Sequence, residues 1–199
     1  MPPLKRRKLR KAADDEGCQE RAGQSWQESL EDGSQRRSAA CEEALLAVEA
    51  DGSALRTLED CFRGNAEIVL AAVENNPGAL EWAAPTCKSN KSIVLTAVAQ
   101  DGTMLRWAAL ACRRDREVVC AAVKQNWQAL EWAAGNCSSD RQVVLAAVQQ
   151  HGLAMEWAAK NCKSDRTIVR AAVRQNGLAL QWACETCTSD HEIVLTAVK

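Results

Sequence analysis

The sequence predicts an all-α protein, an α-solenoid of short two-helix repeats with a 25-residue period behind a disordered N-terminal tail. Two observations predict this fold. Trp, Cys and Val recur at a step of 25 residues without a gap, and Ala, Val and Leu dominate the apolar residues, with seven Trp, one Phe and no Tyr. Small apolar residues suit close helix packing, and a unit that cannot bury its apolar faces alone must stack on its neighbours. The recurring residues are Trp82, Trp107, Trp132, Trp157 and Trp182; Cys87, Cys112, Cys137, Cys162 and Cys187; and Val73, Val98, Val123, Val148, Val173 and Val198.

Residues 1–40 differ from the rest of the chain because they are polar and have little apolar periodicity. Such a segment cannot bury enough surface to offset its ordering entropy, so we expect a disordered tail. Its basic run suits a nuclear import signal, and it could equally contact RNA or an acidic membrane surface. The run comprises Lys5, Arg6, Arg7, Lys8, Arg10 and Lys11.

The array is predicted over residues 41–199. Its first unit is divergent and carries Thr57 at the position of the recurring Trp. The predicted units are 41–65, 66–90, 91–115, 116–140, 141–165 and 166–190, followed by a half unit, 191–199.

The start of the first helix of each unit is predicted from stretches such as Ser139-Asp140-Arg141-Gln142. In one alternative the Ser hydroxyl caps the first turn and the Gln side chain bonds back to the N-cap backbone. In the other, Asp is itself the N-cap. The sequence does not decide between them. Pairs such as Asn176-Gly177 are expected to end the helix, because both residues tolerate a left-handed backbone.

The second helix is predicted to be short, running from about Ala129 to Cys137, and its α or 3₁₀ character is left open. The Trp column is interpreted as buried wedges between units rather than an aromatic ladder, and the Cys column as small buried thiols. A further column should form a hydrogen-bonded ladder on the buried side. It consists of Asn75, Gln100, Gln125, Gln150 and Gln175.

The unit N-G-x-A-L-x-W-A-x-x-x-C-x-S-D-R-x-I-V-L-x-A-V resembles the family catalogued as domain of unknown function 4116, over about residues 66–199 and more weakly over 41–65. The resemblance implies a tandem helical repeat. The family has no established activity, so the resemblance implies no catalytic or binding residues.

The sequence contains no motif that indicates catalysis, a cofactor or a metal site. The two histidines, His151 and His191, occupy positions where other units carry Asn, Asp, Arg or Lys, and no Ser-His-Asp order or phosphate-binding loop is present. Cys184-Glu-Thr-Cys187 is a single CxxC without a second ligand pair for zinc, and Cys184 is interpreted as a substituted core alanine. We therefore expect that the protein is not an enzyme.

The location of the protein is predicted from what the sequence lacks. No apolar run reaches 18 residues, and the N-terminus has no secretory h-region. Ten Cys are then expected as reduced thiols in an intracellular protein, nuclear or cytoplasmic.

The predicted function is a non-catalytic scaffold that binds an unknown protein or peptide through exposed positions that vary between units. The alternative is nucleic-acid binding by the basic tail and the C-terminal units, since residues 86–199 hold 14 Lys and Arg against 10 Asp and Glu. The half unit keeps the interior pattern at Ile193, Leu195 and Val198, so this end is expected either to self-associate or to dock a partner helix. The candidate surface residues are Lys124, Gln149, Arg174, Arg106, Glu131, Glu156, Gln181 and Lys160.

Overall fold

The computed structural model describes residues 39–198, which contain helices and no strand. The prediction of an all-α repeat fold is confirmed. The chain divides into two units, Met1–Glu43 and Ala44–Lys199, and the helices described below belong to the second. The basic run and nearly all of the predicted tail lie outside the described residues. Residues 39 and 40, which the prediction placed in the tail, are helical.

Each repeat contains three helical segments, because the second predicted helix is divided into a 3₁₀ helix and a single short turn. The long helices are α3 (Ala66–Asn75), α5 (Lys91–Gln100), α7 (Arg116–Gln125), α8 (Arg141–Gln150), α10 (Arg166–Gln175) and α12 (His191–Ala197). The 3₁₀ helices are η1 (Gly52–Arg56), η2 (Pro77–Trp82), η3 (Gly102–Trp107), η4 (Trp127–Trp132), η6 (Gly152–Trp157) and η7 (Gly177–Trp182). The short turns are α2 (Asp60–Arg63), α4 (Pro85–Lys88), α6 (Leu110–Arg113), η5 (Cys137–Ser139), α9 (Lys160–Lys163) and α11 (Glu185–Thr188).

The long helices begin at an Asp or Asn N-cap, which decides between the two alternatives left by the sequence. The carboxylate of Asp140 accepts hydrogen bonds from the backbone N–H groups of Gln142 and Val143 at 2.9 and 3.1 Å. Ser139 instead closes the preceding turn, η5. An Asp side chain therefore satisfies the first orphan N–H groups of the helix.

The expected left-handed helix ends are wrong. Asn176 has φ −151° and ψ 113°, and its side chain caps the following 3₁₀ helix by accepting from Leu178 N–H at 3.0 Å. Among the described residues, positive φ occurs only at Gly135. Gly102 is required for a different reason, since a Cβ there would overlap the carbonyl oxygen of Ala122 in the next unit. Gly102 therefore permits close packing between units rather than an unusual backbone angle.

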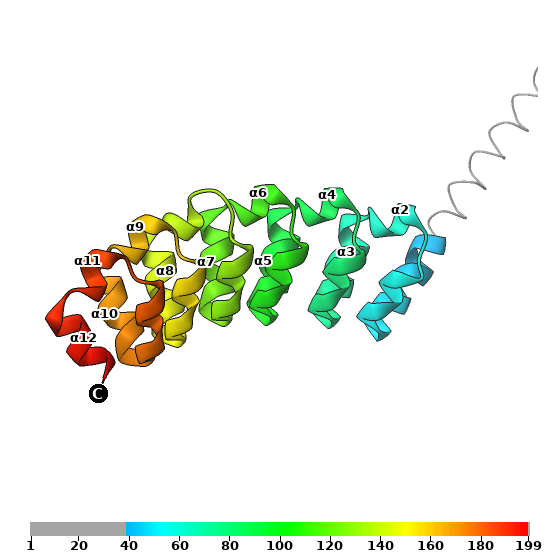
Figure 1. Ribbon diagram of the computed structural model, residues 1–199. Coiled ribbons are helices and arrows are strands. Elements are labelled where there is room, and N and C mark those ends of the chain that lie inside the picture. The colour runs from blue at the N-terminus through cyan, green and yellow to red at the C-terminus, as the bar shows by residue number, and fades with distance from the viewer. Residues whose placement is uncertain (1–38, 199) are drawn as a thin grey trace, which may run out of the picture. The chain divides into compact units, whose positions relative to one another are not determined.

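Within residues 44–199, consecutive long helices contact one another, and consecutive 3₁₀ helices do the same, so the repeats stack as two layers. Figure 1 shows the long helices side by side in chain order. The core lies between the layers and is built from small residues: Val118, Val119, Ala122 and Val123 of α7 are buried, as are Ala129 and Leu130 of η4. Such small side chains allow close interhelical packing.

The Cys and Gln columns tie each repeat to the one before it. The buried thiol of Cys137 donates to the carbonyl of Arg114 at 3.4 Å, and the amide of Gln150 donates to the carbonyl of Val123 at 2.7 Å. The predicted buried thiols and hydrogen-bonded ladder are thus present. The ladder is exposed, however, and not on the buried side as expected, because these Gln side chains reach along the surface to the neighbouring backbone.

The Trp column is half-buried, which corrects the expectation of buried wedges. A Trp ring that ends a 3₁₀ helix lies at the junction between units, where one face stays accessible to a neighbouring side chain. Lys88, for example, lies 5.9 Å from the centre of the Trp107 ring of the following unit.

Candidate partner-binding surface

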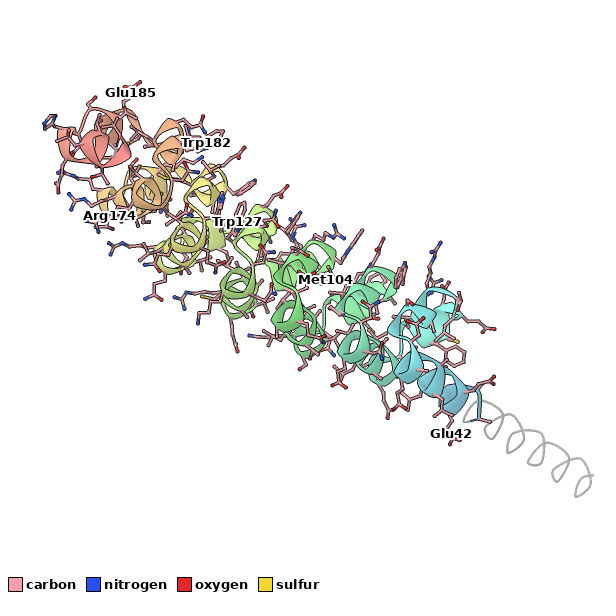
Figure 2. All side chains as sticks on the ribbon, turned by 90° about the horizontal axis from the view of Figure 1, so that it is seen from below. Glu42, Met104, Trp127, Arg174, Trp182 and Glu185 are labelled. Atoms are coloured by element: carbon pink, nitrogen blue, oxygen red, sulfur yellow. The ribbon has the colours of Figure 1, made fainter. Side chains whose placement is uncertain are left out.

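The eight candidate surface residues are all exposed, but they lie on different elements. One group lies near the ends of the long helices, on what we call the long-helix face. The other group lies on η3, η4, η6, η7 and the start of α9, on what we call the 3₁₀ face. Figure 2 shows Arg174 on the side of the long helices and Trp182 and Glu185 on the other. The long-helix group is Lys124, Gln149 and Arg174, and the 3₁₀ group is Arg106, Glu131, Glu156, Gln181 and Lys160.

The long-helix face carries ion pairs between consecutive repeats. In α5, α7, α8 and α10 the first residue is basic and pairs with the Asp that caps the next long helix, as Arg116 does with Asp140 at 2.7 Å. The hydrogen bond from Arg116 holds the pKa of Asp140 below its usual range. The pKa of Lys91 is raised to about 12 by hydrogen bonds with Glu117 and Asp115. The pairs are Lys91–Asp115, Arg116–Asp140, Arg141–Asp165 and Arg166–Asp190.

Sequence reasoning missed these ion pairs. Their signal is a Lys or Arg directly after the capping Asp or Asn, 24 residues before the next Asp. The capping Asp therefore has two roles, because it satisfies the N-terminus of its own helix and neutralises a cation of the preceding one.

The helix α10 has three arginines along one side. Arg166, Arg170 and Arg174 follow one another at four-residue spacing and, with Thr167 and Ala171, line a hollow of about 350 Å³. Asp190 pairs with Arg166, and Glu192 pairs with Arg170. These are the carboxylates of the following helix.

Arg174 differs from the other two arginines of this hollow, which we call the α10 hollow. Within residues 39–198 it has no carboxylate partner, and its side chain is exposed. Other repeats lack this combination, because the positions of Arg170 and Arg174 hold Leu145 and Gln149 in the preceding unit. The α10 hollow therefore combines two tethered cations with one unpaired cation.

The 3₁₀ face has cations above its indole rings. Lys163 lies 5.7 Å from the centre of the Trp182 ring, and its ammonium donates to the carbonyl of Glu156 at 2.8 Å. The same arrangement holds Lys88 over Trp107 with a hydrogen bond to Glu81 at 2.7 Å. These lysines bridge consecutive repeats, and the cation–π contact contributes about 0.5–1 kcal/mol at an exposed site.

An aromatic cluster interrupts the regularity of the 3₁₀ layer. Trp127 stands where four of the repeats have Gly, and it stacks on His151 with ring centroids 4.3 Å apart and planes 10° apart. It also packs against Trp157 at 5.5 Å. His151 replaces the Asn or Asp that caps the other 3₁₀ helices and makes no capping hydrogen bond. Both substitutions are visible in the sequence as departures from the 25-residue columns; the departure at His151 was noted there, whereas that at Trp127 was overlooked.

The described residues offer no group of His, Cys, Asp and Glu side chains that could hold a metal ion. His191 is exposed at the start of α12, and His151 is stacked between repeats. None of the helices described between residues 39 and 198 has the length and apolar content needed to cross a bilayer. The absence of an enzymatic activity stays a prediction.

The half unit exposes part of its apolar face. Leu195 and Val198 are 44% and 76% exposed, whereas Val148 and Val173, at the position of Val198, are buried. Within the array such valines are covered by the next long helix. Self-association through this face stays a prediction.

The stacked layers, the repeated caps and the cross-unit hydrogen bonds define a helical-repeat protein of the α-solenoid class. The model of the family described as Domain of unknown function (DUF4116) matches four overlapping or adjacent segments, residues 42–88, 65–110, 90–135 and 140–187. These segments cover more than half of the chain, so the protein belongs to this family. No curated protein and no solved structure matches the chain.

Proposed function

We propose that the protein is a non-catalytic scaffold that binds an acidic segment of another protein at the α10 hollow. The observation that carries the proposal is the grouping of Arg166, Arg170 and Arg174 around one hollow, where Arg174 has no carboxylate partner among residues 39–198. Arginine suits this role because its planar guanidinium binds a carboxylate through two hydrogen bonds.

The two paired arginines prepare the hollow for a ligand. Asp190 and Glu192 fix the guanidinium groups of Arg166 and Arg170, so little side-chain freedom remains to be lost on binding. Each guanidinium still has donors beyond those used in its own ion pair. Thr167 and Ala171 also line the hollow, so its surface is partly polar and partly apolar, which suits a peptide.

A protein partner is favoured over nucleic acid because the cations of the long-helix face are largely neutralised. Phosphate binding needs a row of unpaired Lys and Arg, each of which releases counterions from the nucleic acid. Here the first residues of α5, α7, α8 and α10 are each engaged by an Asp of the next repeat. The basic run of residues 5–11 lies outside the described residues, so the nucleic-acid alternative is an outcome of the test.

The test compares two charge reversals on the full chain. Arg174→Glu alters the α10 hollow, and Lys160→Glu makes the same change at an exposed position on the 3₁₀ face. Binding of a fluorescein-labelled, Glu-rich peptide and of a single-stranded RNA of equal length is followed by anisotropy over a salt titration. We expect Arg174→Glu to weaken peptide binding by about tenfold or more, as loss of a charged hydrogen bond does, and Lys160→Glu to change it less than about twofold.

Three outcomes contradict the proposal. Equal losses in the two variants would mean that net charge, not the α10 hollow, governs binding. Absence of peptide binding at low salt would remove the proposed ligand class. Tighter binding of the RNA, with a steep salt dependence, would favour the nucleic-acid alternative.

A further inference from the structure

The last described short turn, α11, carries two cysteines where other repeats carry one. Cys187 belongs to the buried Cys column, whereas Cys184 occupies a position that is Ala in the four preceding repeats. Cys184 is half-buried, so it is not a core residue as the sequence suggested. Neither the repeat frame nor the proposed binding function accounts for this second thiol.

The backbone brings the two cysteines together. Cys184 is the N-cap of α11, and the N–H of Cys187 donates to the carbonyl of Cys184 at 2.9 Å, which closes one turn. A hydrogen-bonded turn of four residues brings its terminal Cα atoms within about 7 Å. Disulfides join Cα atoms about 4.4–6.8 Å apart, so the spacing is compatible with a bond between these thiols.

The two thiols have opposite environments. Cys187 is buried and donates to the carbonyl of Ser164 at 3.7 Å; burial, and then the neighbouring Cys184, raise its pKa. Cys184 is partly exposed, and its sulfur lies 2.9 Å from the hydroxyl of Thr186. Hydrogen bonds from the Thr186 hydroxyl and then from Ser164 lower the pKa of Cys184 to about 6.

We propose that Cys184 and Cys187 form a redox-active dithiol, in which Cys184 is the attacking thiolate and Cys187 the resolving thiol, and that its co-reactant is a low-molecular-weight disulfide. An accessible thiolate beside a second, protonated thiol is the arrangement on which thiol–disulfide exchange depends.

The exchange has two balanced steps. The Cys184 thiolate attacks one sulfur of the disulfide R–S–S–R, forms a Cys184–S–S–R bond and releases RS⁻. Cys187 then gives its proton to solvent and attacks the Cys184 sulfur, which forms the Cys184–Cys187 disulfide and releases the second RS⁻. The two cysteines are oxidised by two electrons, and the co-reactant is reduced to two thiols.

The other column cysteines provide an internal comparison. Cys87, Cys112, Cys137 and Cys162 are buried, their pKa values are raised chiefly by burial, and each has Ala three residues before it. Their raised pKa values oppose thiolate formation, and none has a second thiol three residues before it. Ala159→Cys would give Cys162 such a partner at the same spacing, with Asn161 in place of Thr186.

The experiment treats the full-length protein with oxidised glutathione and locates the products by peptide mapping and mass spectrometry. The wild type should form the Cys184–Cys187 disulfide without retaining glutathione. Cys187→Ala should keep glutathione on Cys184, because the resolving thiol is absent, and Cys184→Ala should leave Cys187 unmodified. Retention of glutathione on Cys184 in the wild type would overturn the proposal, as would an absence of any product at Cys184.

The role of Thr186 has its own measurement. Iodoacetamide labelling of Cys184 as a function of pH should have its midpoint near 6 in the wild type and at least about one pH unit higher in Thr186→Val. The new thiol of Ala159→Cys should also titrate higher, because Asn161 replaces Thr186. A wild-type midpoint near the ordinary value of about 8.5 would overturn the assignment of Cys184 as the attacking thiolate.

Discussion

Gly102→Ala should destabilise the array because it acts on the close approach between two repeats. Gly102 is buried at the start of η3, and its N–H donates to the side-chain carbonyl of Gln125 on α7. A Cβ at this position would overlap the carbonyl oxygen of Ala122 and lie 3.0 Å from Oε1 of Gln125. The obstructing atom belongs to backbone, so η3 and α7 must move apart.

The expected cost follows from three contributions. Overpacking costs about 1–3 kcal/mol. Loss of the Gln125 hydrogen bond costs about 0.5–1.5 kcal/mol. Replacing Gly by Ala also reduces the flexibility of the unfolded chain, which stabilises the folded state by about 0.4–1 kcal/mol. Together these contributions predict a net destabilisation of about 0.5–4 kcal/mol, with a midpoint of about 2 kcal/mol.

Urea unfolding followed by far-ultraviolet circular dichroism measures this change. The matched control is Gly64→Ala, where an added Cβ would have its nearest neighbours at 3.6 Å, an ordinary contact distance. We expect this control to stay within about 0.5 kcal/mol of the wild type. If Gly102→Ala unfolds at the same urea concentration as Gly64→Ala, then the close packing of η3 on α7 does not explain the glycine.

Two further predictions concern the Asp caps and the tryptophans. Arg116 lowers the pKa of folded Asp140, so the stability from this pair is present above the unfolded pKa near 3.8 and is lost as pH falls through the lower folded pKa. Asp140→Asn keeps a capping side chain but no charge, so its melting temperature should fall less than that of the wild type between pH 5 and pH 3; identical slopes would contradict this. Trp132→Ala should destabilise by about 2–4 kcal/mol because Trp132 belongs to the repeat frame, and Trp127→Gly, which restores the residue of other repeats, by about 1–2 kcal/mol. A loss below about 1 kcal/mol for Trp132→Ala in urea unfolding would show that this ring is not part of the frame.

The candidate surface could be predicted only in part. Variation between repeats correctly indicated exposed positions such as Lys124 and Arg174, because the constant positions form the core and the contacts between repeats. It could not indicate that these positions belong to two faces, since that depends on the direction of each short helix. The ion pairs of Arg166 and Arg170 could not be predicted either, because their carboxylate partners lie 24 and 22 residues later in the chain.

The sequence by itself determined the repeat and its frame. Its 25-residue step, small buried residues and hydrogen-bonded Gln column follow from local patterns that the repeats share, and all are present in the structure, which also chose Asp over Ser as the helix cap. Only the tertiary structure decided how the second helix is divided, why Gly102 is glycine, and that Trp132 is half-buried. These features depend on how closely one repeat approaches the next. That distance is set by packing between units and not by the residues of one unit alone.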